Sequence, residues 1–328
     1  MLRLPPFTYH RPSRLEDAVA LLGEHGPAAL PMAGGTDLVP NMKHRLFTPT
    51  HVVGLKGVGD LHGIAIEGEE LVIGAAETLA AVSLDPQVRL HVTALAEAAG
   101  QVAGPQLRNQ GTLGGNLCLD TRCTYYNQTE FWRSALGYCL KKDGTVCHVT
   151  RVGRKCVAAH SADTPPVLMA VGAVVDLAGP DGERSLPVRD FFVADGIRNT
   201  RRGPGELVVR VRVPLPPPGT RTAYVKLRQR GAIDFPLLGV AVSARFDGGG
   251  LVESLEGVVT GLGSRPRVLA GWSELAVGER WTAELVEALA ERAYAQCHPL
   301  ENMIVDPEWR RAMVPVHVRR ALLRLRPL

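Results

Sequence analysis

The chain has no long apolar run, few aromatic residues and only a small excess of positive charge. Its apolar runs are far short of the ~20 residues that cross a bilayer, so we expect no membrane span. A net charge of +4, with acidic and basic residues interspersed, provides no concentrated positive field for a phosphate backbone. Nucleic acid is therefore not an expected partner. Residues 1–18 lack the apolar segment and cleavage site of a secretory signal, which makes the cytoplasm the expected compartment.

Several catalytic motifs are also missing from the sequence. It contains no G-x-S-x-G nucleophile turn, no H-E-x-x-H metal motif and no G-x-x-x-x-G-K-[ST] phosphate loop. It has no G-x-G-x-x-G fingerprint in a βαβ unit either, which disfavours a nicotinamide-binding Rossmann domain. We therefore expect no catalytic residue in this chain. No repeat recurs at a fixed period, which disfavours a solenoid or propeller.

The chain has 328 residues, 45% of them hydrophobic, which is enough for two or three domains. Apolar patterns predict small α/β units in the first two thirds, then strands and two helices in the last third. LVVRVRVPL is interpreted as a strand pair, and the basic segment 309–328 as a final helix. PLPPPG cannot donate a sheet ladder and marks the best domain boundary. We expect domains at 1–58, 59–215 and 216–328.

Two glycine-rich loops are the first candidate site. AGGTDL, residues 33–38, falls between a predicted strand and a helix start, and GTLGGN, residues 111–116, follows a predicted helix. Adjacent glycines let the main chain approach a ligand closely, and backbone N–H groups in such loops bind phosphate oxygens. Thr36 offers a hydroxyl donor, while Asp37 suits either a helix cap or a ribose hydroxyl. The simpler interpretation of each loop alone is a tight turn.

Six cysteines form the second notable pattern, and four of them crowd a segment at about 119–159 with neither helical nor strand periodicity. Cys123, Cys139, Cys147 and Cys156 are spaced C-x15-C-x7-C-x8-C. Four thiolates suit a [4Fe-4S] cluster or a structural zinc ion, although the short C-x2–4-C knuckles of zinc sites are absent from this spacing. Unrelated thiols are the third possibility. Cys118 competes with Cys123 as a ligand, but we assign it to loop packing.

Taken together, the two loops resemble the flavin subunits of the molybdenum hydroxylases, where A-G-G-T/H-D/S-L and R-N-x-G-T-x-G-G-N/S both contact FAD. SADTPPVLMAVGAVV and YVKLRQRGAIDFPLLGVAV resemble two further segments of that family. The resemblance covers nearly the whole chain outside the insertion. The resemblance implies an α+β fold, with a two-part FAD-binding domain of small α/β units and a C-terminal α+β domain. The FAD-binding residues that it implies are Met32, Ala33, Gly34, Gly35, Thr36, Asp37, Leu38, Gly111, Thr112, Gly114, Gly115, Asn116, Asp163 and Lys226.

Two of these positions have ordinary alternatives. Asp163 precedes a predicted helix at 164–170 and suits its N-cap, a role compatible with a ribose contact. Lys226 would lie beside the flavin ring system by resemblance, whereas alone it is equally a solvated lysine at a strand end. Elsewhere, Cys297 ends an amphipathic segment and is expected to be a buried apolar residue.

The insertion is similar to one in the flavin subunit of 4-hydroxybenzoyl-CoA reductase, which carries a [4Fe-4S] cluster there. This implies that Cys123, Cys139, Cys147 and Cys156 are the cluster ligands, and Phe131, Trp132 and Tyr138 are expected to shield them from water. As an alternative, these aromatic residues form a small core of the insertion.

The resemblance also implies partners: a molybdenum-cofactor large subunit and a small subunit with two [2Fe-2S] clusters, assembled as a dimer of heterotrimers. Electrons would pass from ferredoxin through [4Fe-4S], FAD and [2Fe-2S] to molybdenum, where 4-hydroxybenzoyl-CoA would be dehydroxylated to benzoyl-CoA. The alternatives are an oxidative relative, such as a xanthine, aldehyde or CO dehydrogenase flavin subunit, and a zinc-stabilised scaffold that has lost flavin.

Overall fold

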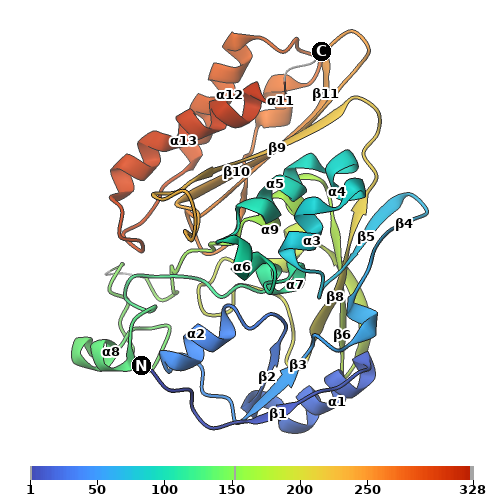
Figure 1. The fold of residues 1–328 in the computed structure, drawn as a ribbon. Helices are drawn as coiled ribbons and strands as arrows, with labels where there is room; N and C mark the ends of the chain where they lie inside the picture. The colour runs from blue at the N-terminus through green and yellow to red at the C-terminus, as the bar shows by residue number, and fades with distance from the viewer. Residues whose placement is uncertain (1, 151–152, 326–328) are drawn as a thin grey trace.

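The computed structural model describes residues 2–150 and 153–325 and contains three sheets (Figure 1). The first is a small parallel sheet of order β1-β3-β2, with α1 packed beside it. Its elements are β1 (Thr8–His10), α1 (Leu15–His25), β2 (Ala29–Met32), α2 (Leu38–Lys43) and β3 (His51–Gly54). Short connections between β2, α2 and β3 place the first glycine loop at the carboxyl end of a strand, where α/β units commonly bind ligands.

The second sheet has five antiparallel strands in the order β4-β5-β8-β6-β7. Its strands are β4 (Ile64–Glu67), β5 (Glu70–Gly74), β6 (Val174–Gly179), β7 (Gly182–Pro187) and β8 (Leu207–Pro214). The accompanying helices are α3 (Leu79–Leu84), α4 (Pro86–His91), α5 (Thr93–Gln101), α6 (Pro105–Arg108), α7 (Leu113–Leu117), α9 (Thr164–Ala170) and α10 (Val188–Phe191). The second glycine loop runs into α7, so the two loops come from different sheets.

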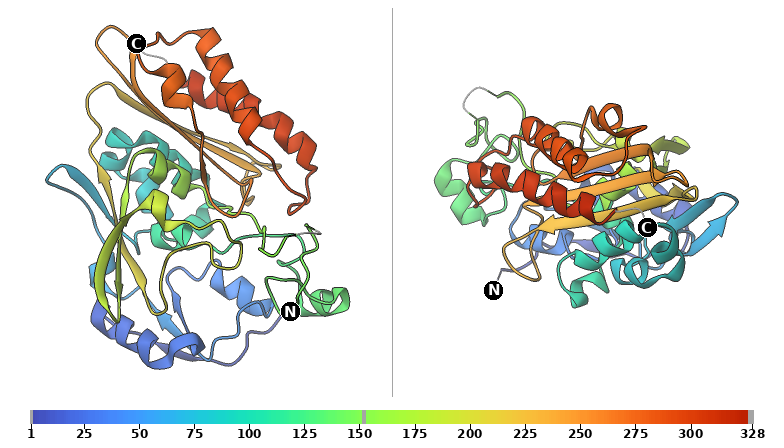
Figure 2. Two further views of the ribbon diagram at one scale, coloured as in Figure 1. Left: turned by 180° about the vertical axis from the view of Figure 1, so that it is seen from behind. Right: turned by 90° about the horizontal axis from the view of Figure 1, so that it is seen from above.

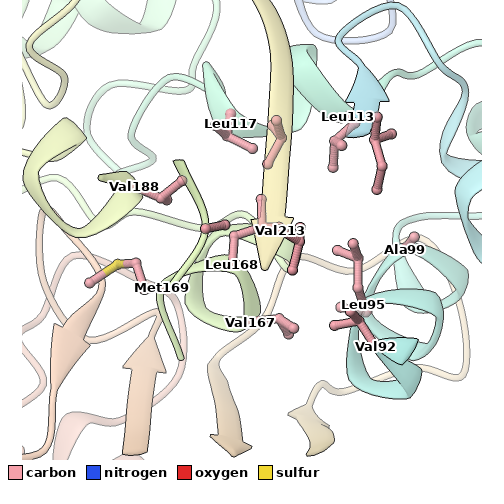
Figure 3. Close-up of a cluster of buried hydrophobic side chains, with 14 of the residues drawn as sticks. Val92, Leu95, Ala99, Leu113, Leu117, Val167, Leu168, Met169, Val188 and Val213 are labelled. Carbon is pink, nitrogen blue, oxygen red and sulfur yellow. The ribbon is translucent and has the colours of Figure 1, made fainter. Parts of the chain in front are cut away.

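The main core lies between this second sheet and its helices. Leu95 of α5, Leu117 of α7, Leu168 of α9 and Val213 of β8 are fully buried and point toward one another (Figure 3). Burying one such side chain stabilises the fold by roughly 1.5–3 kcal/mol. Every residue of α9 is buried, and this helix fixes the position of Asp163 immediately before it.

The third sheet is C-terminal, with antiparallel order β12-β11-β10-β9. Its strands are β9 (Thr220–Leu227), β10 (Leu238–Phe246), β11 (Val252–Thr260) and β12 (Arg267–Val268), and its helices are α11 (Trp272–Ala276), α12 (Ala283–Gln296) and α13 (Pro307–Leu323). Alternate residues of β10 face different layers: Val240 and Val242 join the core under α12 and α13, whereas Ala241 joins the main core. The sheet is therefore covered on both faces, as the views in Figure 2 show.

The insertion packs beside α2 (Figures 1 and 2). We expected no regular structure there, but it contains helix α8 (Glu130–Leu136). Thr129 caps this helix by accepting a hydrogen bond from the Trp132 N–H, and Gly137 ends it in the left-handed conformation. The fully buried Arg133 donates to the carbonyl oxygens of His44 and Arg45, which attaches α8 to the end of α2.

Two other expectations need correction or completion. LVVRVRVPL is not a strand pair but the single strand β8, because it hydrogen-bonds to β5 on one side and β6 on the other. The final helix, expected over 309–328, is α13 and ends at Leu323; residues 326–328 lie outside the described residues. Across the described ranges, no helix combines the length and apolar character needed to cross a bilayer.

Candidate flavin site and cysteine cavity

A cavity of about 1090 Å³ is lined by both glycine loops. Its wall includes thirteen of the fourteen residues that we expected to contact FAD: Met32, Ala33, Gly34, Gly35, Thr36, Asp37, Leu38, Gly111, Thr112, Gly114, Gly115, Asn116 and Asp163. Most of its lining is apolar, with a few polar groups from loops, which is the usual character of a cofactor site. The size and lining suit a dinucleotide with a flat ring system.

The two glycine loops touch each other backbone to backbone. A Cβ added at Gly34 would overlap the carbonyl oxygen of Gln110, and one added at Gly111 would come within 3.3 Å of Thr36 Oγ1. Gly35 has φ +69°, a left-handed conformation that side chains rarely adopt. Glycine is thus required for the contact between the loops, and they form one continuous wall of the cavity.

Asp37 does not cap α2, although it occupies the N-cap position. Its carboxylate forms an ion pair with Arg122 and accepts a hydrogen bond from Asn41 Nδ2 at 3.1 Å. Burial raises the pKa of Asp37, and the Arg122 charge opposes that shift. The Arg122 guanidinium also stacks 4.4 Å from the ring centroid of Phe235. This cluster joins the first loop to the residues that precede Cys123.

Asp163 reaches the cavity wall from the start of α9, where its side chain makes no capping hydrogen bond. The capping function belongs to Asn116, whose Oδ1 accepts from the N–H and the hydroxyl of Thr164 at 3.1 and 2.7 Å. Asp163 instead accepts from Tyr224 Oη at 2.7 Å and from Lys226 Nζ at 3.0 Å. Asp163 therefore occupies the N-cap position as expected, but its side chain does not cap the helix.

Lys226 does not line the cavity. Its side chain is completely buried, and Nζ donates to Asp163 and to the carbonyl oxygen of Gln101 at 3.1 Å. Burial lowers the pKa of Lys226 and raises that of Asp163, while their ion pair opposes both shifts. It is therefore not a solvated strand-end lysine, and it stands behind Asp163 rather than beside the cavity.

A second, smaller cavity is lined by Cys123, Cys139, Cys147 and Cys156. Residues separated by more than thirty positions thus converge on one point, as the spacing hypothesis requires. No three of these sulfur atoms lie within 4.8 Å of one another among the described residues. A single tetrahedral zinc ion, with Zn–S bonds of about 2.3 Å, would bring all four within about 4 Å. The four sulfur atoms are therefore not gathered as tightly as a single bound zinc ion would hold them.

The surroundings of the cysteine cavity differ from our expectation. Phe131 is 84% exposed and Trp132 37% exposed, and neither they nor Tyr138 line the cavity. The inward face of α8 is taken by Arg133 instead. Tyr125 and Tyr126 line the cavity and provide its aromatic wall.

The other two cysteines lie apart from this cavity. Cys118 lines the flavin cavity, and Cys297 is buried in the C-terminal core.

Within the cysteine cavity, burial raises the pKa of the Cys123 thiol to about 11. This thiol would have to lose its proton before it could bind a metal.

The two cavities adjoin each other through one short segment. Asp120 and Arg122 line the flavin cavity, and Cys123 lines the cysteine cavity. Lys141, which lines the cysteine cavity, donates to Asp120 Oδ1 at 2.7 Å and to the carbonyl oxygen of Gly196 at 2.8 Å. A redox group in one cavity would therefore lie close to a redox group in the other.

Among the residues of the flavin cavity wall that the sequence did not predict are two stretches that come late in the chain. They are residues 197–200 with 202–204, before β8, and residues 233–235, after β9. Both are loops with no phosphate-binding pattern. The only signal for the second stretch was the family resemblance of the segment YVKLRQRGAIDF, which contains residues 233–235 and part of the predicted flavin site.

Comparisons with known proteins define the family. Residues 5–216 match the FAD binding domain in molybdopterin dehydrogenase, and residues 223–325 match the CO dehydrogenase flavoprotein C-terminal domain. The chain belongs to this family of FAD-binding medium subunits. The expected α+β fold is confirmed, and so is the expected flavoprotein family.

Individual relatives extend the match to nearly the whole chain. The carbon monoxide dehydrogenase medium chain of Hydrogenophaga pseudoflava is 32% identical over 318 residues, covering 97% of this chain and 96% of its own. The aldehyde oxidoreductase FAD-binding subunit PaoB of Escherichia coli is 33% identical over 304 residues, covering 89% and 91%. A solved carbon monoxide dehydrogenase from H. pseudoflava superimposes with a TM-score of 0.80, at 32% identity and 98% coverage of each chain.

Proposed function

We propose that this chain is the FAD-carrying electron-transfer subunit of a molybdenum hydroxylase of the oxidative type, related to CO, aldehyde and xanthine dehydrogenases. The observation that carries this proposal is the single cavity built by both glycine loops and Asp163. The substrate would react at molybdenum in a large partner subunit. A small subunit with two [2Fe-2S] clusters would carry electrons between that molybdenum and the FAD of this chain. A dimer of such heterotrimers is the proposed assembly.

We also propose that the cysteine cavity holds a [4Fe-4S] cluster bound by Cys123, Cys139, Cys147 and Cys156. Their convergence on one cavity supports a shared four-thiolate site, and the absence of short C-x2–4-C knuckles from their spacing favours a cluster over zinc. When bound, FAD exchanges electrons singly or in pairs and a cluster passes them one at a time. The residues between the two cavities, Asp120 to Arg122, would then set the distance between two relay stations.

The direction of electron flow separates this proposal from the reductase that the insertion first suggested. The relatives described above are named as subunits of a carbon monoxide dehydrogenase and an aldehyde oxidoreductase, which favours oxidation over the dehydroxylation of 4-hydroxybenzoyl-CoA. The reductase remains the second candidate because of one observation, the four-cysteine cavity next to the flavin cavity. In that case ferredoxin would deliver electrons at the cysteine cavity.

We retain three domains as a proposal: 1–58 and 59–215 as the two parts of the FAD-binding domain, with the insertion at about 119–159 in the second, and 216–328 as the C-terminal domain. The flavin cavity has walls from both of the first two parts. This division predicts that residues 216–328 contribute little to FAD affinity except through Lys226, Tyr224 and the 233–235 loop.

Cofactor content tests the proposal directly. The full chain is purified anaerobically, and FAD, iron, acid-labile sulfide and zinc are quantified. FAD with about four irons per chain is the expected result. Zinc without flavin would overturn the flavin assignment and favour a scaffold. Cys139→Ser should lose iron while FAD remains, and Cys118→Ser, outside the cysteine cavity, should retain iron.

Activity of the assembled complex decides between the two directions. Oxidation of CO, aldehydes and xanthine is assayed with an artificial electron acceptor, and reduction of 4-hydroxybenzoyl-CoA with reduced ferredoxin. Turnover of a substrate of the first group supports the dehydrogenase proposal. Turnover of 4-hydroxybenzoyl-CoA alone would establish the reductase instead.

A further inference from the structure

Three imidazoles meet on the small parallel sheet, away from both cavities. His10 ends β1, His25 ends α1 and His51 begins β3. The parallel register pairs Thr8 with His51 and His10 with Val53. Because side chains alternate between the two faces of a sheet, His10 and His51 lie on the same face, with His10 beside the residue two positions after His51. That face is covered by α1, because Val53 packs with Leu22 in one core cluster. His25, at the end of α1, therefore lies beside the rings of His10 and His51.

The geometry of the imidazole cluster is close to that of a metal site. One ring nitrogen from each of the three residues lies within 4.8 Å of the other two. His10 Nε2 and His51 Nδ1 are 2.9 Å apart, and the His25 and His51 rings stack with centroids 3.7 Å apart. Metal–nitrogen bonds of about 2.0–2.1 Å place neighbouring ligand nitrogens about 3 Å apart. The three nitrogens are thus close enough to share one ion, but the His25 and His51 rings are stacked, so the side chains must rotate before the three nitrogens converge on it.

The chemistry of the three side chains also suits a metal ion, because imidazole nitrogen is a common ligand for divalent transition metals. All three residues are partly exposed, which gives an ion access from solvent.

We propose that His10, His25 and His51 form a binding site for one divalent transition-metal cation, with Zn²⁺ as the reference ion. Imidazole ligands suit zinc, copper and nickel, and three protein ligands leave a position for water or for the Glu24 carboxylate. The site is separate from the flavin and cysteine cavities, whose walls contain none of these histidines. A bound ion would connect the end of α1 to β1 and β3.

Zinc titration of the full chain tests this site. The protein is stripped with a chelator and titrated calorimetrically with ZnCl₂ under nitrogen at about pH 7.5, above the ordinary imidazole pKa. His25→Ala is the test variant because His25 ends a helix, and His62→Ala is the matched control because His62 lies outside the cluster. Zinc bound by the cysteines is the same in all three proteins and cancels in the comparison.

The expected result is that the wild-type chain and His62→Ala bind about one more zinc ion than His25→Ala. Affinity for that ion should fall at least about 100-fold, because even outer partners of metal ligands contribute 10–100-fold. Circular dichroism verifies folding, and His10→Ala repeats the test if His25→Ala is unfolded. Equal zinc stoichiometry and affinity in the wild type and both cluster variants would overturn the proposal and leave the cluster as a stacking contact only.

Discussion

Lys141 Nζ lies 2.7 Å from Asp120 Oδ1, and this ion pair joins the wall of the cysteine cavity to the wall of the flavin cavity. The Lys141 side chain is 5% exposed and that of Asp120 is 19% exposed, so water screens the pair weakly. Nζ also donates to the carbonyl oxygen of Gly196 and lies 4.5 Å from the Tyr126 ring centroid. The bond to Gly196, which lies outside the insertion, attaches the insertion to the flavin-binding part through this buried charge.

Lys141→Met should lower the free energy of unfolding by about 3 kcal/mol, near the lower end of the cost of breaking a buried pair, because Asp120 loses its partner. Urea unfolding at a fixed FAD concentration measures this change. Lys142→Met is the control: Lys142 is adjacent in sequence, and its pair with Asp143 is much more exposed. It should cost less than about 1 kcal/mol. Equal losses for the two variants would contradict the role of Lys141.

Gly34→Ala should prevent normal flavin binding. The added methyl group would overlap the Gln110 carbonyl oxygen, which is backbone and can move only if the two loops separate. Overpacking of this kind costs about 1–3 kcal/mol, which corresponds to roughly 10–100-fold in FAD affinity if the loops bind FAD together. Gly59→Ala meets no atom within 4 Å and should leave affinity unchanged. FAD titration monitored by flavin fluorescence makes the comparison; unchanged affinity in Gly34→Ala would contradict a paired-loop site.

Predictions from the sequence were most accurate where a structural feature depends on the residue type at a single position. The glycines at 34, 35, 111 and 114 line the flavin cavity as expected, and at position 34 only glycine permits the close approach of the two loops. The helix at 164–170 was also placed correctly because its apolar pattern is compact and begins directly after Asp163. In these cases the signal is local, and local sequence is enough.

Side-chain direction and long-range contact were harder to predict. Lys226 was expected beside the flavin, but strand alternation puts it on the same face as Tyr224, and both point to Asp163 behind the cavity wall. Phe131 was expected inside the insertion, but Arg133 occupies the inward face of α8. The imidazole cluster brings together His10 and His51, which are 41 positions apart, and no local sequence pattern predicts this contact.

The Asp163–Lys226 pair predicts non-additive effects on flavin binding. Asp163→Asn and Lys226→Met should each weaken FAD binding, the first directly and the second by releasing the carboxylate that Lys226 holds at 3.0 Å. The double variant should bind FAD about as tightly as Asp163→Asn alone, with a coupling energy of about 0.5–3 kcal/mol. Equilibrium FAD titration of the four proteins measures the coupling.

A remote substitution provides the control for this cycle. Arg245→Met removes an ion pair between Arg245 and Glu253, at residues that do not line the flavin cavity. Its effect should simply add to that of Asp163→Asn. Additive effects of Asp163→Asn and Lys226→Met would instead indicate that Lys226 contacts the flavin independently.

His160 should make the fold sensitive to mild acid. The side chain is completely buried, and burial lowers its pKa to about 3. Nδ1 lies 2.7 Å from Thr260 Oγ1, while Nε2 has no hydrogen-bond partner among the described residues. In the unfolded chain the pKa returns to about 6.5. The unfolded state then binds more protons, so stability falls as the pH decreases from about 6.5 toward 3.

Between pH 7 and about pH 5 this single group should remove about 2 kcal/mol from the free energy of unfolding, following proton linkage. His160→Asn retains a hydrogen-bonding group near Thr260 and does not titrate in this range, so its pH dependence should be shallower by that amount. Urea unfolding of both proteins at the two pH values measures the difference. His298→Asn serves as the control, because His298 is exposed and its substitution should leave the slope unchanged. A slope in His160→Asn equal to that of the wild type would show that His160 accepts a proton in the folded protein as readily as in the unfolded chain.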